Sequence, residues 1–279
     1  MLPKLPLASW INQFVNWLSD VLGPVLGAVS QVVQTVVSGI TVGLEHVPWW
    51  LLTLVIAALG YLAGRWKLAI GTLIGLLLIE DLRLWNHMIE TLVLVIVSSF
   101  VAVVIGIPLG IWAARRKSVY QVMSPLLDLM QTMPPFVYLV PVLLLFSIGV
   151  VPAILATVVF SMPPAIRLTR LGILQVPDDL VEAARAFGTS DRQLLWKVQL
   201  PLAMASIKAG INQTLMLALS MVVIAAMIGA SGLGADVMSA LETVDVGKGV
   251  EAGLSIVIIA IILDRISQNL GKRSSKPSA

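Results

Sequence analysis

Residues 171–202 read LGILQVPDDLVEAARAFGTSDRQLLWKVQLPL and form the one long polar interval in the apolar carboxy-terminal half of the chain. The apolar side chains of this interval recur at helical spacing and charged side chains fill the other positions, a pattern typical of amphipathic helices. The apolar set is Val176, Leu180, Val181, Ala184, Phe187, Leu194, Leu195 and Val198, and the charged set is Asp178, Asp179, Glu182, Arg185, Asp191 and Arg192. The interval is therefore predicted to be a folded element that a partner can contact, rather than a linker.

The composition indicates that most of the chain lies in a lipid bilayer. Of its 279 residues, 58% are hydrophobic and 12% are charged, and the mean hydropathy is +0.97. Ordinary globular domains are about a quarter charged, so we expect an all-α integral membrane protein. Cysteine is absent and only His46 and His87 represent histidine, which argues against disulfides, cysteine-ligated metals and histidine-rich metal catalysis. No charged n-region, apolar h-region and cleavage site open the chain, so no removable signal peptide is expected.

Apolar runs and their interruptions divide the chain into four parts. Residues 1–46 hold an amphipathic helix over 10–38, which fits a helix lying at the membrane interface and, equally, a helix packed against the other spans. Residues 47–86 form an accessory transmembrane hairpin hinged at 64–67, residues 87–270 form the main transmembrane unit, and the basic tail 271–279 is expected to be disordered. About seven transmembrane helices are predicted, at 47–64, 66–79, 87–114, 120–146, 149–164, 207–228 and 250–266.

The basic residues predict the orientation in the membrane. If the polar interval is cytoplasmic, fifteen Lys and Arg side chains lie on the inner face and three on the outer face. The inner set is Arg65, Lys67, Arg115, Arg116, Lys117, Arg167, Arg170, Arg185, Arg192, Lys197, Lys208, Arg265, Lys272, Arg273 and Lys276, and the outer set is Lys4, Arg83 and Lys248. Since basic residues accumulate on the cytoplasmic side, we predict a multi-pass protein of a prokaryotic cytoplasmic (inner) membrane, with the N-terminus outside and the C-terminus in the cytoplasm. The net charge of +3 follows from this distribution and indicates no nucleic-acid partner.

The sequence lacks the motifs of the common hydrolytic sites. Neither GxxxxGK[ST], HExxH nor GxSxG occurs, and residues 271–274 (GKRS) lack the earlier glycine and the preceding strand of a phosphate loop. We therefore expect no catalytic residue, no metal ligand and no nucleotide hydrolysis in this chain. If the protein moves a solute against a gradient, an ion or another subunit must supply the energy.

Asp128 is the acidic residue expected deepest inside a span, about two helical turns beyond Tyr120. An intramembrane carboxylate is a functional candidate whose expected partner is an arginine. Arg167 and Arg170 lie at the inner end of the next span. Because one acid without a second makes a poor proton relay, we interpret Asp128 as half of a structural ion pair.

Glycines and prolines predict where the spans pack and where they break. The GxxxG spacings at 60/64, 71/75 and 106/110 favour close helix packing within the chain. Prolines at 134, 135, 163 and 164 predict helix breaks, which membrane proteins tolerate where the backbone is buried or lines a cavity. Kinks used only for packing are an equal alternative. The residues predicted to line a solute path near these breaks are Gln131, Thr132, Met133, Pro134, Ser161, Met162, Pro163, Asn212, Gln213, Ser220 and Met221.

The polar interval also carries a family signature. Glu182-Ala183-Ala184, then Gly188, then Leu200-Pro201 have the spacing of the EAA loop of ABC importer permeases, with Val198 in place of the usual isoleucine. Glycine ends a helix well because it adopts the left-handed conformation, so Gly188 is expected between two helices, the second starting at Asp191 and closed by Pro201. Over 85–270 the chain further resembles permeases of glycine betaine/proline betaine importers. That resemblance rests on residues 127–134 (LDLMQTMP), 160–169 (FSMPPAIRLT), 210–214 (GINQT) and 225–234 (AAMIGASGLG).

The resemblance implies a type I ABC importer permease fold with a coupling helix that docks on a cytoplasmic ABC ATPase. The implied docking residues are Glu182, Ala183, Ala184, Phe187, Gly188, Leu200 and Pro201. It also implies two copies of the ATPase, a second copy of this chain and an extracytoplasmic substrate-binding protein. ATP and Mg²⁺ would be bound by the ATPase, and this chain would hold no cofactor.

The solute implied by the resemblance is glycine betaine or a related quaternary ammonium osmoprotectant, imported under osmotic stress. Choline, carnitine or proline are alternatives within the same class. An ion-coupled secondary carrier is the alternative of a different class, and a purely structural membrane scaffold is the third. A quaternary ammonium solute is ordinarily bound by an aromatic cage, but six of the eight tryptophans precede residue 86 and are interpreted as membrane anchors. The resemblance assigns the cage to the separate binding protein.

Overall fold

The chain folds into helices, as predicted. A computed structural model describes residues 6–273, without the side chains of residues 7, 8, 14, 138 and 270–273. No strand occurs within the described range. The helices are α1 (Leu7–Glu45), α2 (Trp49–Asp81), α3 (Trp85–Arg115), α4 (Lys117–Thr132), α5 (Pro135–Phe146), α6 (Val150–Leu174), α7 (Asp178–Ala186), α8 (Asp191–Leu194), the π-helical turn η1 (Leu195–Gln199), α9 (Leu200–Ser220), α10 (Val222–Ala226), α11 (Leu233–Thr243) and α12 (Val246–Arg273).

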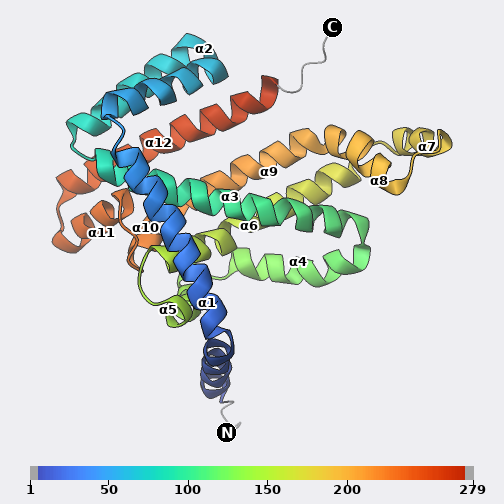
Figure 1. Cartoon of the computed structure of the whole chain (residues 1–279), viewed down its shortest axis with the longest axis horizontal. Coiled ribbons are helices and arrows are strands. Elements are labelled where there is room, and N and C mark those ends of the chain that lie inside the picture. Colours follow the sequence, from blue (N-terminus) through green and yellow to red (C-terminus); the bar gives the residue numbers. More distant parts are fainter. Residues whose placement is uncertain (1–5, 274–279) are drawn as a thin grey trace.

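Three long helices, α3, α6 and α9, lie side by side and make the centre of the bundle (Figure 1). Glycines let α3 approach α6 closely. A Cβ on Gly106 would lie 2.8 Å from the Cβ of Ala165, and one on Gly110 would lie 2.7 Å from the carbonyl oxygen of Ile166. Because only glycine fits at these distances, the prediction that the 106/110 spacing serves packing within the chain is confirmed.

The prediction of about seven transmembrane helices is confirmed. Within the described range, six helices are long and apolar enough to cross a membrane, and α4 and α5 together make a seventh if they count as one bent span. The six are α1, α2, α3, α6, α12 and the continuous helix Asp191–Ser220. The membership differs from the prediction, because α1 qualifies by length and composition and α2 is one helical element that contains a reversal.

The reversal in α2 falls where the hinge was predicted. Gly64 and Arg65 leave the helical conformation, with φ/ψ of −124°/17° and 61°/−162°. Residues from both ends of α2, among them Trp49 and Asp81, line one cavity of about 780 Å³. A straight helix of 33 residues would hold its ends about 50 Å apart. The two halves of α2 therefore run back along each other, as the two adjacent rods in Figure 1 show.

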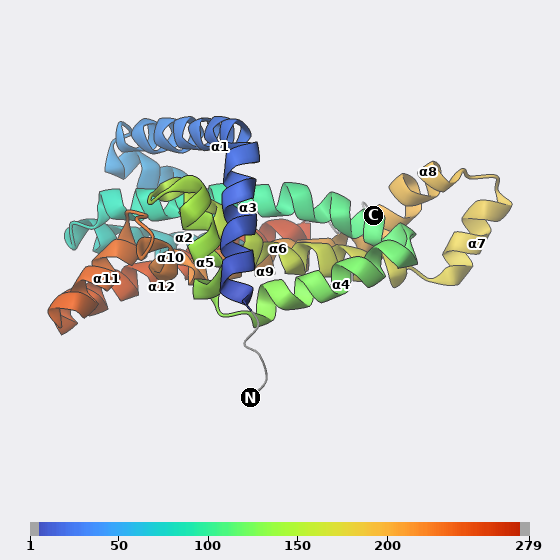
Figure 2. The same ribbon diagram turned by 90° about the horizontal axis from the view of Figure 1, so that it is seen from below.

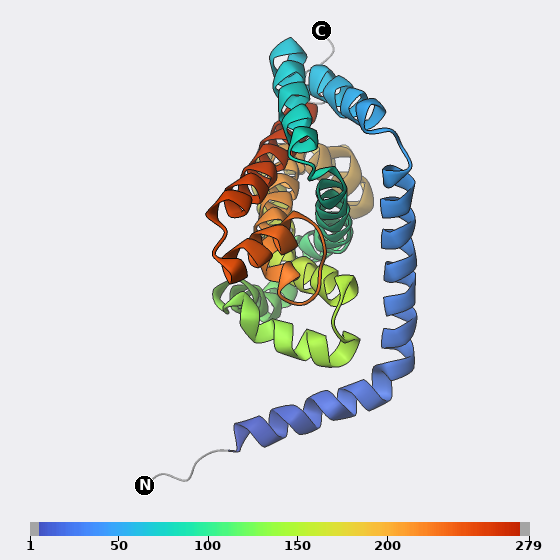
Figure 3. The same ribbon diagram turned by 90° about the vertical axis from the view of Figure 1, so that its left-hand side faces the viewer.

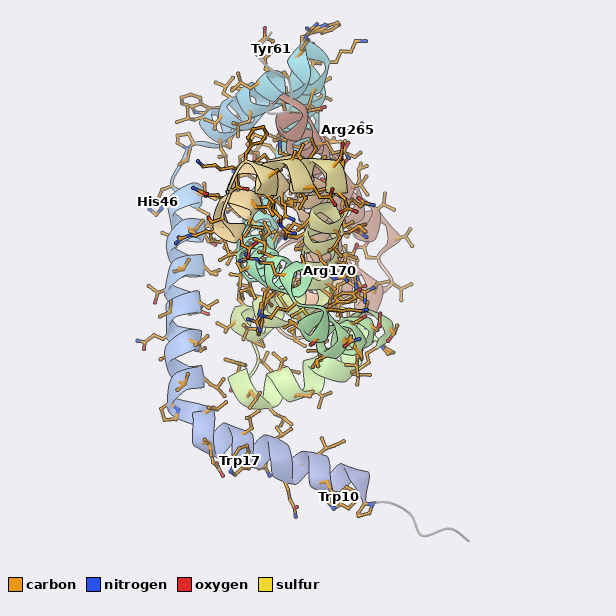
Figure 4. The ribbon with its side chains drawn as sticks, turned by 90° about the vertical axis from the view of Figure 1, so that its right-hand side faces the viewer. Trp10, Trp17, His46, Tyr61, Arg170 and Arg265 are labelled. Atoms are coloured by element: carbon orange, nitrogen blue, oxygen red, sulfur yellow. The ribbon has the colours of Figure 1, made fainter. Side chains whose placement is uncertain are left out.

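Helix α1 is packed in part against the bundle, which is one of the two alternatives predicted for the amino-terminal helix. Seen down the long axis of the bundle, α1 runs across that axis and bends on the way (Figure 3), and Pro24 lies inside it. Its first part buries Val15 but carries Trp10 and Trp17, both more than half exposed (Figure 4). Its second part packs on α3 and α5 and buries Val37. The helix is thus both transverse to the bundle and partly packed against it.

The prolines break one predicted span and leave another intact. Helices α4 and α5 meet at 105°, between Thr132 and Pro135, so the predicted span 120–146 is bent at Pro134 and Pro135. The predicted break at 163–164 is wrong, because both prolines lie inside α6, which runs unbroken from Val150 to Leu174. Helices α3 and α9 pack along α6 on two sides, and fifteen of its 25 residues are buried. This packing holds α6 helical in spite of the backbone hydrogen bonds that its prolines cannot donate.

The predicted disordered tail begins later than expected. Gly271, Lys272 and Arg273 belong to α12. The rest of the predicted tail, 274–279, lies outside the described residues.

Candidate functional site

The polar interval forms a hairpin that projects from one end of the bundle. We call α7, its turn and α8, residues 178–194, the coupling hairpin. Figures 1 and 2 show it at the far end of the molecule, beyond the ends of α3 and α6. None of the nine residues of α7 is buried, and Phe187, directly after it, is 90% exposed. Asp178 and Asp179 in the first turn and Arg185 in the last turn complement the helix dipole and favour the helical conformation of α7.

Gly188 ends α7 in the way that the sequence predicts. Its φ is +78°, in the left-handed region that favours glycine. The backbone N–H of Gly188 donates to the carbonyl of Arg185 at 2.9 Å, and the N–H of Thr189 donates to the carbonyl of Ala184 at 3.2 Å. These two bonds define a Schellman motif. The Thr189 hydroxyl also donates to the Ala184 carbonyl, at 2.6 Å, so the turn between α7 and α8 has one defined geometry.

The second helix of the hairpin starts as predicted but does not end at Pro201. Ser190 caps α8: the Gln193 N–H donates to its hydroxyl at 3.3 Å, and the Ser190 N–H donates to the Gln193 side chain at 3.0 Å. From Asp191 the helix continues through η1 into α9 as far as Ser220. Pro201 lies in the first turn of α9, directly after η1. A proline inside a helix clashes with the carbonyl four residues earlier, and the wider π-helical turn before Pro201 accommodates it.

The predicted docking residues divide into an exposed set and an anchor. Glu182, Ala183, Phe187 and Gly188 are exposed and Ala184 is half-buried. Leu200, in contrast, is 8% exposed and lies in an apolar cluster with Ile173 of α6, Leu195, Ala203 and Ile207. Leu200 therefore fixes the base of the hairpin to the bundle, while Pro201 remains exposed beside it.

A basic cavity of about 650 Å³ separates the coupling hairpin from the ends of α3 and α6. Arg115, Arg116 and Arg185 line it together with Asp191. Arg115 Nη2 donates to the backbone carbonyl of Asp191 at 3.4 Å, and Arg185 Nη2 lies 3.9 Å from the Asp191 carboxylate. Asp191 thus connects α3 and α7 at the base of the hairpin.

The structure places the predicted pathway residues in three surroundings. Gln131, Thr132 and Pro134 are exposed at the break between α4 and α5, with Met133 half-buried beside them. Ser161 and Pro163 of α6 and Met221 after α9 are buried, and Met162 packs between two apolar clusters. On α9, Gln213 and Ser220 are exposed, whereas Asn212 donates from Nδ2 to Asp264 Oδ1 of α12 at 3.0 Å. Exposed polar groups and groups used for packing are therefore mixed in the predicted set.

The ion pair predicted at Asp128 is present. Arg167 Nη2 lies 2.5 Å from Asp128 Oδ1, which confirms the prediction of an arginine partner. Arg170, the other candidate, instead lies over the ring of Tyr120, with its guanidinium carbon 3.5 Å from the ring centroid. Figure 4 places Arg170 near the middle of the bundle when viewed from the end that carries the hairpin. Sequence reasoning did not find the Tyr120 contact.

A second set of contacts missed from sequence ties α11 to the start of α3. His87 Nδ1 lies 2.6 Å from Asp236 Oδ2, and the Leu233 N–H donates to the Thr91 hydroxyl at 2.8 Å. Gly232, at φ +100°, leaves no room for a side chain, because a Cβ there would lie 2.5 Å from the Thr91 hydroxyl oxygen. The partners in each contact are more than 140 residues apart in sequence, so no local sequence pattern predicts these contacts. Among the described residues, no group of three or more His, Cys, Asp or Glu side chains is placed to hold a metal ion.

The chain is similar to known transport proteins. The family model for the binding-protein-dependent transport system inner membrane component matches residues 106–276. The glycine betaine transport system permease protein OpuAB of Bacillus subtilis (strain 168) is 51% identical over 279 residues, which cover 100% of this chain and 99% of that protein. The glycine betaine/carnitine transport permease protein GbuB of Listeria monocytogenes serotype 1/2a (strain 10403S) is 47% identical over 277 residues, 98% of each chain.

A solved structure supports the same fold. A chain from the inward-facing MetNI methionine ABC transporter superposes with a TM-score of 0.57 at 26% identity, over 66% of this chain and 91% of that chain. The family model spans more than half of the chain and includes the coupling hairpin and the helices that carry it. The chain therefore belongs to the binding-protein-dependent transport system inner membrane component family and is a multi-pass membrane component of a transport system.

Proposed function

We propose that this chain is the membrane-spanning permease subunit of an ATP-driven importer of glycine betaine or a related quaternary ammonium osmoprotectant. The observation that carries the proposal is the coupling hairpin, whose helix α7 has defined ends and no buried residue and which projects from the bundle of a member of an importer family. A projecting helix without buried residues gains little by itself, so its regular ends and exposed surface are best explained by a partner that binds it.

The proposed partner is a cytoplasmic ABC ATPase. Glu182, Ala183 and Phe187 present an acidic group, a small side chain and a large apolar side chain on the exposed hairpin. A groove with a basic residue for Glu182 would match this surface. Since the sequence has no phosphate loop of its own, ATP and Mg²⁺ are bound by the partner, and this chain acts as a transport subunit and not as an enzyme.

The proposed assembly has two copies of the chain, two ATPase subunits and one extracytoplasmic binding protein. One chain carries one coupling hairpin, so two copies supply the docking points for two ATPases. In this arrangement the hairpin and the C-terminus are cytoplasmic and the N-terminus is outside, as the distribution of basic residues favours. Exposed polar side chains at membrane depth, such as Gln131 and Gln213, are costly against lipid, which supports a solute path between the copies.

The proposed solute follows from the relatives. OpuAB is a glycine betaine permease at 51% identity, and GbuB is a glycine betaine/carnitine permease at 47% identity. Carnitine is therefore the second candidate solute. Both molecules carry a quaternary ammonium group and a carboxylate, so one binding protein of suitable cage size could deliver either.

The test is uptake of radiolabelled glycine betaine into vesicles that contain the chain, its ATPase and its binding protein. We expect uptake only with ATP, and competition by unlabelled carnitine if carnitine is also a solute. Glu182→Lys and Gly188→Asp are expected to leave the chain in the membrane and to abolish uptake, because each adds an unfavourable charge to the docking surface. Lys117→Glu is the matched control. Like Glu182→Lys it reverses the charge of one side chain on the predicted inner face, but it lies outside the hairpin.

Two results would contradict the proposal. Unchanged uptake in both hairpin variants would remove the docking role. Uptake driven by an ion gradient in vesicles that lack the ATPase would instead identify a secondary carrier.

A further inference from the structure

The coupling hairpin and the break between α4 and α5 are more than 40 residues apart along the chain. Helix α6 joins the hairpin at one end and packs on α4. Helix α6 ends at Leu174, three residues before α7 begins at Asp178. Arg167 and Arg170 lie on the last two turns of α6, with Arg170 about 6 Å from the end of the helix. Any displacement of α7 that moves α6 therefore moves these two arginines as well.

Both arginines contact α4, at two separate points. Arg167 pairs with Asp128 at 2.5 Å, and Arg170 covers the ring of Tyr120 at 3.5 Å. Tyr120 and Asp128 are eight residues apart, about 12 Å along α4. One contact would leave a pivot, whereas two contacts at this separation oppose both rotation and sliding of α4 on α6. We call these four side chains the arginine latch.

The two arginines of the latch are half-buried. The Nε atoms of Arg167 and Arg170 are fully buried and have no hydrogen-bond partner among the described residues. The guanidinium group of Arg167 therefore interacts through its Nη2 atom with Asp128, and that of Arg170 interacts with the face of the Tyr120 ring. The ion pair itself is more open, because the side chains of Arg167 and Asp128 are 34% and 58% exposed, so by itself it contributes about as much as a surface ion pair.

Helix α4 packs on α3 and α6 but buries few of its side chains. Only Leu127 and Met130 of its sixteen residues are buried, in a small cluster with Ile166 of α6. By comparison, α6 is fixed between α3 and α9 with fifteen buried residues. The latch therefore adds two polar contacts to the packing of α4 on α3 and α6, and its ion pair lies four residues before the end of α4 at Thr132.

We propose that the arginine latch makes α4 follow the cytoplasmic end of α6, so that movement of the coupling hairpin reaches the α4–α5 break. In this proposal Tyr120 and Arg170 are positioning residues for transport, and the proposal rests on the proposed function of the hairpin. The latch joins two parts of the chain that do not touch: the surface that meets the ATPase and the exposed polar residues at the bend.

The test compares Tyr120→Leu with Tyr120→Phe in the reconstituted importer. Phenylalanine keeps the aromatic face and therefore the cation–π contact, whereas leucine keeps most of the apolar volume and loses that contact. Three quantities are measured: the amount of assembled complex, the ATPase rate and the solute taken up per ATP hydrolysed. For Tyr120→Leu we expect normal assembly and ATPase rate with uptake per ATP reduced about two- to fivefold, the lower end of the loss that corresponds to one half-buried cation–π contact. Tyr120→Phe should match the parent chain.

A second measurement uses the absence of cysteine. Gln131→Cys is labelled by a soluble thiol reagent with and without ATP, in the parent chain and in Tyr120→Leu. We expect labelling to depend on ATP in the parent chain and to lose that dependence in Tyr120→Leu. The proposal would be overturned if labelling of the parent chain did not depend on ATP, or if labelling depended on ATP equally in the parent chain and in Tyr120→Leu.

The remaining outcomes are also decisive. If assembly, ATPase rate and uptake fall together in Tyr120→Leu, the contact serves packing only and the latch is rejected. If leucine and phenylalanine both match the parent chain, the contact has no role. Gly188→Asp is measured in parallel, because normal uptake in that variant refutes the docking role itself, while loss of uptake there with a normal Tyr120→Leu refutes the latch alone.

Discussion

Replacing Gly188 by valine is expected to misdirect α7 without unfolding the bundle. Gly188 has φ +78°, and nothing lies within 4 Å of the position where its Cβ would stand. Any defect therefore comes from the backbone conformation and not from a collision inside this chain. Since α7 contributes no buried residue, the core and the membrane insertion of the chain should be unaffected.

The size of the effect follows from the turn geometry. A left-handed backbone costs an L-residue about 1–2 kcal/mol, and a β-branched side chain is especially unfavourable there. Two hydrogen bonds of the turn, at 2.9 and 3.2 Å, depend on that conformation. A cost of 1–2 kcal/mol lowers the population of the correct turn relative to its alternatives by a factor of about 5 to 30.

The assay is ATP-driven uptake per assembled permease. Gly188→Val should reduce uptake by at most about 5- to 30-fold, the limit reached when the correct turn has become the minor conformation. Gly188→Asn is the matched control and should keep most of the activity, because asparagine adopts the left-handed conformation more readily. Normal uptake in Gly188→Val would refute the reasoning. Equal losses in both variants would show that side-chain volume, and not backbone conformation, decides at this position.

Three further predictions concern the bundle. Asp128→Asn should lower the amount of assembled permease in the membrane without changing any ion dependence of uptake; a shift in the pH dependence with normal assembly would contradict the structural ion pair. Gly110→Leu should sharply reduce the folded protein recovered from membranes, since a Cβ there lies 2.7 Å from backbone of α6, whereas Gly71→Leu should be tolerated in open space. In the cysteine-free chain, a soluble maleimide should label Gln131→Cys and leave Ser161→Cys unlabelled, as their exposure predicts.

Local patterns predicted the features whose causes are local. The hinge at 64–67, the helical hairpin in the polar interval and the left-handed Gly188 each depend on residues within one or two turns. The Asp128 pair was also predictable, because a charge inside a membrane requires a partner and few arginines are in reach. For these features sequence spacing and elementary energetics were sufficient.

Features that depend on packing were mispredicted or missed. Proline favours a helix break in isolation, but α3 and α9 hold α6 straight through Pro163 and Pro164. Pro201 likewise does not end its helix, because a π-helical turn precedes it. The contacts Arg170–Tyr120 and His87–Asp236 join residues 50 or more positions apart, and a single sequence holds no signal for either.

The predicted site was recovered unevenly for the same reason. The docking residues Glu182, Ala183 and Gly188 follow from the family signature, whereas the amphipathic pattern groups Phe187 with the apolar side chains although it is 90% exposed. The burial of Leu200 could not be predicted from local sequence, since it depends on Ile173 of α6. Seven of the eleven predicted pathway residues, 131–134 and 161–163, lie at or beside prolines. The structure leaves some of them exposed and buries others, so proximity to a proline is a poor guide to which side faces a cavity.

The docking role of the coupling hairpin is tested most directly by crosslinking to the ATPase. A photoactivated crosslinker is attached to Ala183→Cys, which is exposed on α7, or to Ser118→Cys, which is exposed at the start of α4 on the same predicted face of the membrane. We predict a covalent adduct between the chain and the ATPase subunit from position 183 and little or none from position 118. No adduct from position 183 in an assembled, ATP-hydrolysing complex, or equal adducts from both positions, would contradict the assignment of the hairpin as the docking element.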